Sequence, residues 1–550
     1  MRILGINPFH DSSVAVFTDG NIEFFSKEER LSRIKRDKHP FISLDTAISS
    51  VGAIDAVAIC APTNLDGAIH TYYQYVNKQL KVPEIVNLSN EHHLQHAALA
   101  FYNSGFEESL VIVADRNGSF IGLNARESET VFVASYPNSF TPIYKNLWLE
   151  DSTKKPESVR DIEEKFKNYK TKIGIHVDSQ QGLVKVYESA TTLIGQHVLE
   201  NGKTMGLAAY GEDNLNFPKL FSNFGVGIDQ FFFHKNNYDM DYACYSSLKK
   251  HLLKTPMTEK NYKEFANYAF QVQKQSQEAM LELITSSVTS TGITNVCVTG
   301  GYGLNVVANA FYIENLPNVN FYFEPLADDS GNSIGGAMYV YRSMTQDLKI
   351  NKLKHTFFNG TLDTKTTNYG KPCSPIDIAK YIVEGKSVAI FNGLAEAGPR
   401  ALGNRSILFD PRNPEAKKIV NKIKKREWYR PFAAAVLKED ANKYFYMPIE
   451  ESPFMTVSFK SLPESKNVIP GVIHVDNTCR IQTVTYESGP IYDVLLAFKE
   501  LTGHGILLNT SFNLAGEPLV QTFDEAVEVL ETSELDILWL PKAEKYLTKG

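Results

Sequence analysis

The sequence predicts a multidomain α/β protein with a duplicated core in its N-terminal half and a second α/β domain at its C-terminus. The chain has 550 residues, which is too long for one ordinary hydrophobic core. Two strand–hairpin segments, each followed by helical sequence, occur in the first half. Helical and strand patterns then alternate from about residue 374 onward, which is typical of an α/β domain.

The first predicted unit lies within the first forty residues. It consists of three strands, at Ile3–Ile6, Ser13–Thr18 and Ile22–Ser26. The dipeptide Asp19-Gly20 separates the last two strands and predicts a hairpin turn, because both residues tolerate a positive φ.

The second predicted unit begins at Leu110–Asp115 and turns at Asn117-Gly118. It continues through strands at Phe120–Ala125 and Val131–Ser135. Two units of this kind predict a duplicated core, and this topology resembles the actin-like and sugar-kinase-like nucleotide-binding folds (ASKHA).

Two helices and a strand are predicted around these units. Ser89–Phe106 is expected to be helical, with Ser89 or Asn90 as its N-cap. Asn261–Ser290 has the pattern of a long amphipathic helix. Val296–Thr299 predicts a buried strand that leads into a glycine-rich turn.

Composition shifts suggest how the chain is divided. Residues 137–180 are polar and predict an insertion with a short helix, and residues 212–260 predict a second insertion or lid. We expect one domain over residues 1–350, a linker over 351–373 and a second domain over 374–550.

Charge and hydropathy exclude several classes of protein. The formal net charge of −7 argues against a binder of nucleic acid over its whole surface. The N-terminus enters a strand-like segment and lacks the pattern of a signal peptide, and no apolar run is long enough to span a membrane. The five cysteines form no CxxC pair, which suits a reducing cytoplasm. A symmetric homodimer is the default expectation for the assembly.

Two histidines and two aspartates form a candidate metal site. His92 and His96 are spaced i, i+4 on a predicted helix, so both rings leave from one face. Asp115 and Asp329 each follow a predicted strand, where open α/β folds build their sites. Such a set favours Fe(II), Mn(II) or Zn(II) with open positions, although two helical histidines alone also suit a core or surface role.

His10 lies in the predicted turn between the first two strands. Because imidazole titrates near neutral pH, His10 is a candidate general base. A hydrogen bond that positions a ligand is the alternative role.

Glycine-rich segments supply candidate nucleotide contacts. Gly300 and Gly301 follow a strand and precede a helix, and Asn305 opens that helix. Glycines at such a turn allow close approach of a ligand, and a helix N-terminus favours phosphate. Gly202 and Lys203 belong to a second glycine-containing segment, which lacks the spacing of a Walker A loop.

Cationic and amide side chains recur along the C-terminal part. Arginine forks bind phosphate or carboxylate, and a compact set of them predicts a site for phosphate-bearing ligands. A structural loop of Arg–Asp pairs and a groove for a DNA backbone are the alternatives. The candidate residues are Arg400, Arg405, Lys424, Arg430, Arg480, Asn509 and Ser511.

Together these motifs resemble the O-carbamoyltransferase family, which includes the nodulation-factor and tobramycin enzymes. The family has HHxxHA, an aspartate nineteen residues later and PxxxDxG, which match His92, His96, Asp115 and Asp329. It also has GGVxxNxxxN and KxREPFRPFAP, and a His-Asp pair where this chain has His10. The chain departs from the family at Asn201, Ala209, Tyr302, Trp428 and Tyr429.

The resemblance implies a C-terminal YrdC-like domain that makes carbamoyl-adenylate from ATP, bound with Mg²⁺, and carbamoyl phosphate. It implies that Lys424, Arg430 and Arg480 serve this step, and that the metal polarises the carbamoyl carbonyl. The acceptor is then a hydroxyl of a small molecule, a sugar or a 5-hydroxymethyl pyrimidine of DNA. A threonylcarbamoyl enzyme for tRNA and an actin-like ATPase switch are the alternatives.

Overall fold

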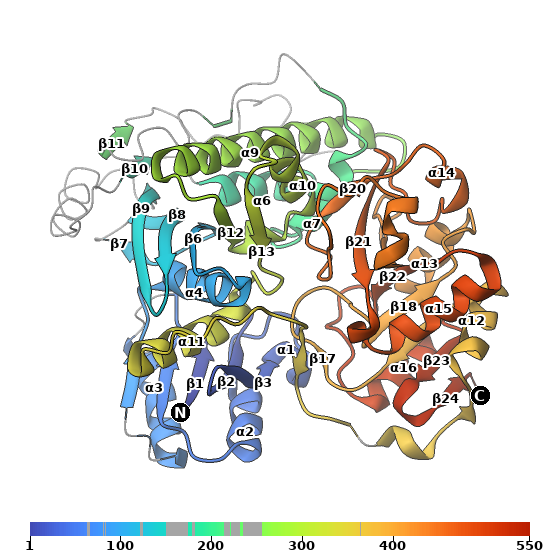
Figure 1. The fold of residues 1–550 in the computed structure, drawn as a ribbon, viewed down its shortest axis with the longest axis horizontal. Coiled ribbons are helices and arrows are strands. Elements are labelled where there is room, and N and C mark those ends of the chain that lie inside the picture. The colour runs from blue at the N-terminus through green and yellow to red at the C-terminus, as the bar shows by residue number, and fades with distance from the viewer. Residues whose placement is uncertain are drawn as a thin grey trace. The chain divides into compact units, whose positions relative to one another are not determined.

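The computed structural model describes most of the chain, and its residues separate into two compact units (Figure 1). Unit 1 contains Met1–Phe9, Ala15–Ile22 and Ile48–Leu353. Unit 2 contains His10–Val14, Glu23–Ala47 and Lys354–Gly550. The described residues are 1–62, 66–80, 82, 84–121, 125–149, 174–178, 182–213, 220–221, 231–234, 256–363 and 365–549.

The first sheet of unit 1 contains the strand order β2-β1-β4-β5. These strands are β1 (Arg2–Asn7), β2 (Ser13–Thr18), β4 (Ala56–Ile59) and β5 (Glu84–Asn87). Strands β1, β4 and β5 run parallel. The predicted hairpin turn after β2 is confirmed, since Asp19 and Gly20 have φ values of 47° and 87°.

The second sheet of unit 1 repeats that order as β8-β6-β12-β13. Its strands are β6 (Glu108–Ala114), β8 (Ala125–Ser135), β12 (Asn295–Thr299) and β13 (Asn320–Phe323). Strand β6 pairs antiparallel with β8 and parallel with β12, which pairs parallel with β13. The repeated order confirms the predicted duplication of an α/β core.

The prediction of a polar insertion with a short helix from residue 137 is wrong at its start. Strand β9 (Ser139–Leu149) pairs antiparallel with β8 and continues the second sheet. Two of its polar residues are buried with partners: Lys145 forms an ion pair with Glu127, and Asn146 Nδ2 donates to Glu129 Oε2 at 2.7 Å. Most of the rest of that insertion, and most of residues 212–260, lie outside the described residues.

Helices α4 (His92–Ser104) and α11 (Asn332–Thr345) pack against one another in unit 1 (Figure 1). A Cβ at Gly335 would lie 2.1 Å from the backbone oxygen of Gln95, so only glycine permits this approach. Helix α4 begins at His92, with Glu91 as its N-cap, rather than at the predicted Ser89 or Asn90. The predicted long helix is confirmed as α9 (Tyr262–Thr291).

Unit 2 is built on a sheet with the order β15-β24-β23-β16-β18-β22-β19-β21-β20. Helices α12 (Pro375–Val383) and α15 (Pro490–Thr502) contribute to one of its two hydrophobic cores. Helices α13 (Ala416–Lys424) and α16 (Phe523–Thr532) contribute to the other. The site-bearing strands are β18 (Arg405–Phe409), β19 (Ala433–Leu437), β21 (Thr478–Val484) and β22 (Ile506–Ser511).

The predicted linker also contains regular structure. Strand β14 (Phe357–Asn359) pairs with residues of both β3 (Asn21–Lys27) and β17 (Ala395–Glu396). Strand β15 (Lys371–Pro372) pairs antiparallel with β24 (Lys545–Thr548).

Glu324, which follows β13, makes the stability of unit 1 depend on pH. Burial raises the pKa of Glu324 from 4.5 to about 7, against the hydrogen bonds of Asn103, Tyr322 and the Leu326 N–H. The folded state therefore binds more protons than the unfolded state between these values. The stabilisation is complete below pH 4.5 and is lost as the pH rises through 7.

We expect Glu324→Gln to flatten this dependence, because the amide cannot ionise. Urea unfolding at pH 5 and pH 8 should show that the wild-type free energy of unfolding falls by roughly 3 kcal/mol more than that of the variant. An equal fall in both proteins would contradict the assignment to Glu324.

Candidate metal centre and cationic site

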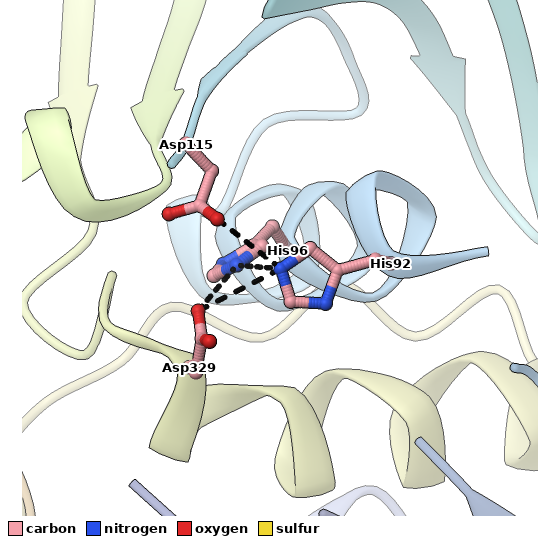
Figure 2. A group of neighbouring side chains, drawn as sticks. All are labelled: His92, His96, Asp115 and Asp329. Atoms are coloured by element: carbon pink, nitrogen blue, oxygen red, sulfur yellow. Dashed lines mark hydrogen bonds and ion pairs between the residues drawn. The ribbon is translucent and has the colours of Figure 1, made fainter. Parts of the chain in front are cut away.

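The four predicted metal-site residues come together in unit 1. Figure 2 shows His92 and His96 on one face of α4, with Asp115 and Asp329 facing them. The two Nε2 atoms are 3.3 Å apart, and His92 Nε2 is 3.3 Å from Asp115 Oδ2. Asp329 Oδ1 lies 3.6 Å from His92 Nε2 and 3.4 Å from His96 Nε2. All four ligand atoms lie within 4.8 Å of one another.

These distances fit a single divalent ion. Two ligand atoms that are each about 2.1 Å from a metal lie about 3.0–3.4 Å apart at octahedral and tetrahedral angles. The four measured separations, from 3.3 to 3.6 Å, are close to that range. Two imidazoles and two carboxylates suit Fe(II), Mn(II) or Zn(II). Binding of an ion by these residues remains a prediction that the geometry supports.

Backbone and amide groups orient the two carboxylate-bearing segments. The Gly301 N–H donates to Asp115 Oδ1 at 3.0 Å, so the predicted nucleotide glycine serves the metal centre. Asn7 Nδ2 donates to the backbone oxygen of Asp329 at 2.9 Å. Sequence reasoning missed Asn7, because its role depends on a contact across 322 positions of the chain.

The charges of the centre reinforce one another. Burial lowers the pKa of His92, but Asp329 and Asp115 outweigh burial and the net shift is upward. Burial raises the pKa of Asp115, but His92 and His96 outweigh it and the net shift is strongly downward. Both shifts come from opposite charges held at short range. A bound cation would also stabilise the ionised form of the two carboxylates.

His93 lies apart from this cluster. Its Nδ1 is 2.7 Å from Thr130 Oγ1. Burial lowers the pKa of His93 to about 3, so the ring stays neutral at physiological pH.

Two buried glutamates near Asp115 escaped sequence analysis. Burial raises the pKa of Glu188 to about 7, although Arg116 Nε lies 2.9 Å from its carboxylate. Burial also raises the pKa of Glu129 to about 7, against hydrogen bonds from Asn146 and the Leu183 N–H. Groups that titrate near neutral pH are candidates for proton transfer. The spacing of two between Glu127 and Glu129 at the start of β8 was the available signal for Glu129.

The glycine-rich segments have largely structural contacts in the described residues. Asn305 is the N-cap of α10 (Val306–Asn315), and its Oδ1 accepts from the Ala308 N–H at 3.1 Å. Gly202 and Lys203 belong to α7 (Asn201–Ala208), where Lys203 Nζ lies 2.9 Å from Glu200 Oε2. Their nucleotide contacts remain predictions.

Unit 2 gathers the predicted cationic residues around β22. Lys424, at the end of α13, is buried, and its Nζ donates to Ser511 Oγ at 3.0 Å and to Asn513 Oδ1 at 2.7 Å. Asn509 Nδ2 donates to Gln482 Oε1 at 3.1 Å. Asn509 Oδ1 has no hydrogen-bond partner among the described residues. Strands β19 and β22 pair Ala433 with Asn509, and β21 pairs Arg480 with Ala433.

The buried Lys424 and the half-buried arginines of unit 2 repel one another. Burial lowers the pKa of Lys424 well below its usual range, and Arg426 and Arg430 lower it further. Burial and Arg430 together hold the pKa of Arg480 at about 10, although Cys479 opposes them. Burial lowers the pKa of Arg426, and the nearby charges of Arg430 and Arg480 lower it further. Buried cations without enough counter-charge favour an anionic ligand.

Arg400 and Arg405 have different surroundings. Arg405 is fully buried, and Arg400 is half-buried. The guanidinium of Arg405 donates to backbone oxygens, and its pKa falls to about 10 because of burial. This pattern suits a residue that holds its loop, so its ligand contact remains a prediction. The acceptors are the carbonyls of Asn392, Gly393, Asn404, Val520 and Gln521.

His10 belongs to unit 2, whereas the four metal-site residues belong to unit 1. Its Nδ1 lies 2.8 Å from Asp11 Oδ2. Burial raises the pKa of Asp11, but Lys27 and His10 outweigh burial and the net shift is downward. A fixed imidazole–carboxylate pair suits a base or a positioning residue, and the choice between these roles remains a prediction.

Family models match both parts of the chain. The model described as "Carbamoyltransferase N-terminus" matches residues 68–338, and "Carbamoyltransferase C-terminus" matches residues 379–546. The chain belongs to the carbamoyltransferase family. This assignment confirms the resemblance drawn from the motifs and identifies the protein as a carbamoyltransferase.

Named relatives of this carbamoyltransferase include nodulation proteins. It is 29% identical to nodulation protein NolO of Bradyrhizobium diazoefficiens, over 81% of this chain and 76% of that one. It is 28% identical to nodulation protein NolNO of Sinorhizobium fredii, over 96% of this chain and 77% of that protein. Among solved structures, full-length HypF is 17% identical with a TM-score of 0.38, over 62% of this chain and 56% of that one.

We expect Gly300→Ala to damage the metal centre. Gly300 has a φ of 79°, and an added Cβ would lie 2.4 Å from the backbone oxygen of Ala114. The clash should move the Gly301 N–H away from Asp115 and lower both stability and metal affinity. Thermal unfolding and Mn²⁺ calorimetry would measure the two effects.

Gly292→Ala is the matched control. Gly292 has a φ of 75°, and nothing lies within 4 Å of an added Cβ. This control should lose only about 1 kcal/mol of stability, because its αL backbone (ψ 0°) is less strained for alanine than that of Gly300 (ψ 167°), and because it lacks the clash. Equal losses of stability and of Mn²⁺ affinity in both variants would show that the close approach at Gly300 has no importance for the metal centre.

Proposed function

We propose that this carbamoyltransferase is an ATP-dependent O-carbamoyltransferase with one reaction in each unit. In unit 2, water cleaves carbamoyl phosphate to carbamate and phosphate. A carbamate oxygen then attacks the α-phosphorus of ATP, which forms carbamoyl-adenylate and releases pyrophosphate. In unit 1, a hydroxyl of the acceptor attacks the carbamoyl carbon. AMP then leaves, the hydroxyl proton is lost and an O-carbamate forms.

The clustered cations of unit 2 are the observation that carries the first reaction. Both substrates are polyanions, and Lys424 and Arg480 supply charge that no ion pair neutralises among the described residues. Arg430, which pairs with Glu427 at 3.5 Å, adds further positive charge. Asn509 Oδ1 is suited to accept a hydrogen bond from the carbamoyl NH₂ group. Ser511 and Asn513 hold Lys424 Nζ in place for phosphate. Mg²⁺ accompanies ATP in this step.

The metal centre of unit 1 suits the second reaction. An ion held by His92, His96, Asp115 and Asp329, either Fe(II) or another divalent metal, would supply Lewis-acid polarisation of the carbamoyl carbonyl. Gly301 holds the Asp115 carboxylate and Asn7 holds the backbone of Asp329, so the site needs little rearrangement. Glu188 can take up a proton near neutral pH.

The acceptor is proposed as a hydroxyl compound of one of three classes: a small molecule, a sugar or a 5-hydroxymethyl pyrimidine of DNA.

In the described residues, no helix combines the length and apolar character that crossing a membrane requires. A cytoplasmic location remains our expectation, and so does a homodimer.

The first test omits the acceptor. Purified protein with ATP, Mg²⁺ and carbamoyl phosphate should release pyrophosphate and form carbamoyl-adenylate, detected by mass spectrometry. Lys424→Ala and Arg480→Ala should each reduce this rate at least about hundredfold, because each removes a charge-assisted contact from a desolvated site. Lys418→Ala, which changes an exposed lysine of α13, should leave the rate unchanged. Formation of ADP and phosphate without pyrophosphate would contradict the proposal.

Removal of a metal-site residue should separate the two reactions. We expect His96→Ala to keep acceptor-free pyrophosphate release while the O-carbamate yield falls at least about hundredfold, since Lewis-acid catalysis contributes several kcal/mol. A panel of an aminoglycoside, a chitooligosaccharide and 5-hydroxymethylcytosine DNA would supply the hydroxyl. Loss of both activities together would contradict separate sites.

A further inference from the structure

We infer that the side-chain oxygen of Asn332 is a fifth protein ligand of the metal ion, beside the two histidines and two aspartates. This inference rests on the metal site of the proposed function. It adds a residue that the sequence motifs do not include, and it bears on which metal the centre selects.

Asn332 lies where a ligand would have to lie. It is the first residue of α11 and follows Asp329 by three positions, so one helical turn presents both side chains to the same side. Asn332 is fully buried. Its Nδ2 is 3.2 Å from His96 Nε2 and 3.5 Å from His92 Nδ1. The first distance equals the usual spacing of neighbouring ligand atoms, about 3.0–3.4 Å.

The contacts of the amide leave its orientation open. Asn332 Oδ1 is buried and has no hydrogen-bond partner within the described part of the chain. Oxygen and nitrogen of an Asn amide have nearly the same shape, so a half-turn exchanges their positions without moving other atoms. The half-turn breaks no hydrogen bond of the oxygen. It places the oxygen about as close to His96 Nε2 as the nitrogen lies now.

A bound cation selects the turned orientation. The Nε2 lone pair of His96 cannot accept an N–H from Asn332 and bind a metal at the same time. The carbonyl dipole is attracted to the cation, whereas the NH₂ group is repelled by it. Amide carbonyls are accepted ligands of divalent cations that prefer oxygen.

The resulting set has two nitrogens and three oxygens. Five protein ligands leave one open position on a six-coordinate ion such as Mn(II) or Fe(II). They do not suit the four-coordinate geometry that Zn(II) usually takes in proteins. Asn332 would therefore act against zinc and leave a single position for a substrate oxygen.

The test compares Asn332→Ala with Asn332→Asp. Alanine removes the oxygen, whereas aspartate retains it and cannot donate an N–H. We expect calorimetry to show that Asn332→Ala binds Mn²⁺ about 10–100-fold more weakly than wild type, as is typical for loss of a contact that supports a metal site. Asn332→Asp should bind at least as tightly as wild type. Asn315→Ala, which changes an exposed asparagine of α10, is the control with unchanged affinity.

Cobalt(II) absorption gives a readout of coordination that does not depend on activity. Loss of a ligand in Asn332→Ala should strengthen the visible d–d bands relative to wild type, because lower coordination numbers absorb more strongly. Circular dichroism and thermal unfolding of the metal-free proteins would establish that both variants fold.

The outcomes separate the two claims. Equal Mn²⁺ affinity and equal cobalt spectra in wild type and Asn332→Ala would overturn the inference while the metal site stands. Equal weakening in Asn332→Ala and Asn332→Asp would show that the N–H is the important group, which also overturns it. Failure of wild-type protein to bind Mn²⁺ or Co²⁺ at all would overturn the proposed metal site itself.

Discussion

The close approach of α11 to its neighbours is the constraint on which the metal centre depends. Gly335 lets α11 contact the backbone of α4, and Gly5 does the same for β1, where an added Cβ would lie 1.9 Å from the Ser333 oxygen. Because α4 carries the histidines and the turn before α11 carries Asp329, the packing sets the distances between ligand atoms. Larger residues at either glycine would separate them.

The two units concentrate opposite kinds of charge. In unit 1, carboxylates outnumber cations around the histidines, and Glu129 and Glu188 titrate near neutral pH as a result of burial. In unit 2, the buried Lys424 and the half-buried Arg426 and Arg480 influence one another, and their pKa values fall. A cation is therefore favoured in one unit and an anion in the other, as metal-assisted transfer and phosphate chemistry require.

The features that could be predicted from the sequence are those set by the spacing of residues within one helix, strand or turn. The histidine pair, the strand-end aspartates and the hairpin at Asp19-Gly20 follow from the geometry of one helix, strand or turn. Strand β9 was missed because the polar composition of residues 137–180 suggested an insertion, whereas partners on β8 allow Lys145 and Asn146 to be buried.

Roles that depend on distant contacts could not be predicted. Asn7 and Asn332 reach the metal centre only because the fold brings β1 and α11 to α4. The inclusion of Glu23–Ala47 in unit 2 depends on contacts with residues more than three hundred positions away, such as the bond from Lys27 N–H to Asn359 Oδ1. Sequence periodicity carries no information about such contacts.

The most direct measurement of the central claim is an anomalous difference map from crystals grown with Mn²⁺. The account predicts one strong peak per chain in unit 1, about 2.0–2.2 Å from His92 Nε2, His96 Nε2 and a carboxylate oxygen of both Asp115 and Asp329. An ordered chain with no peak there, or with its peak at another group of residues, would contradict the account.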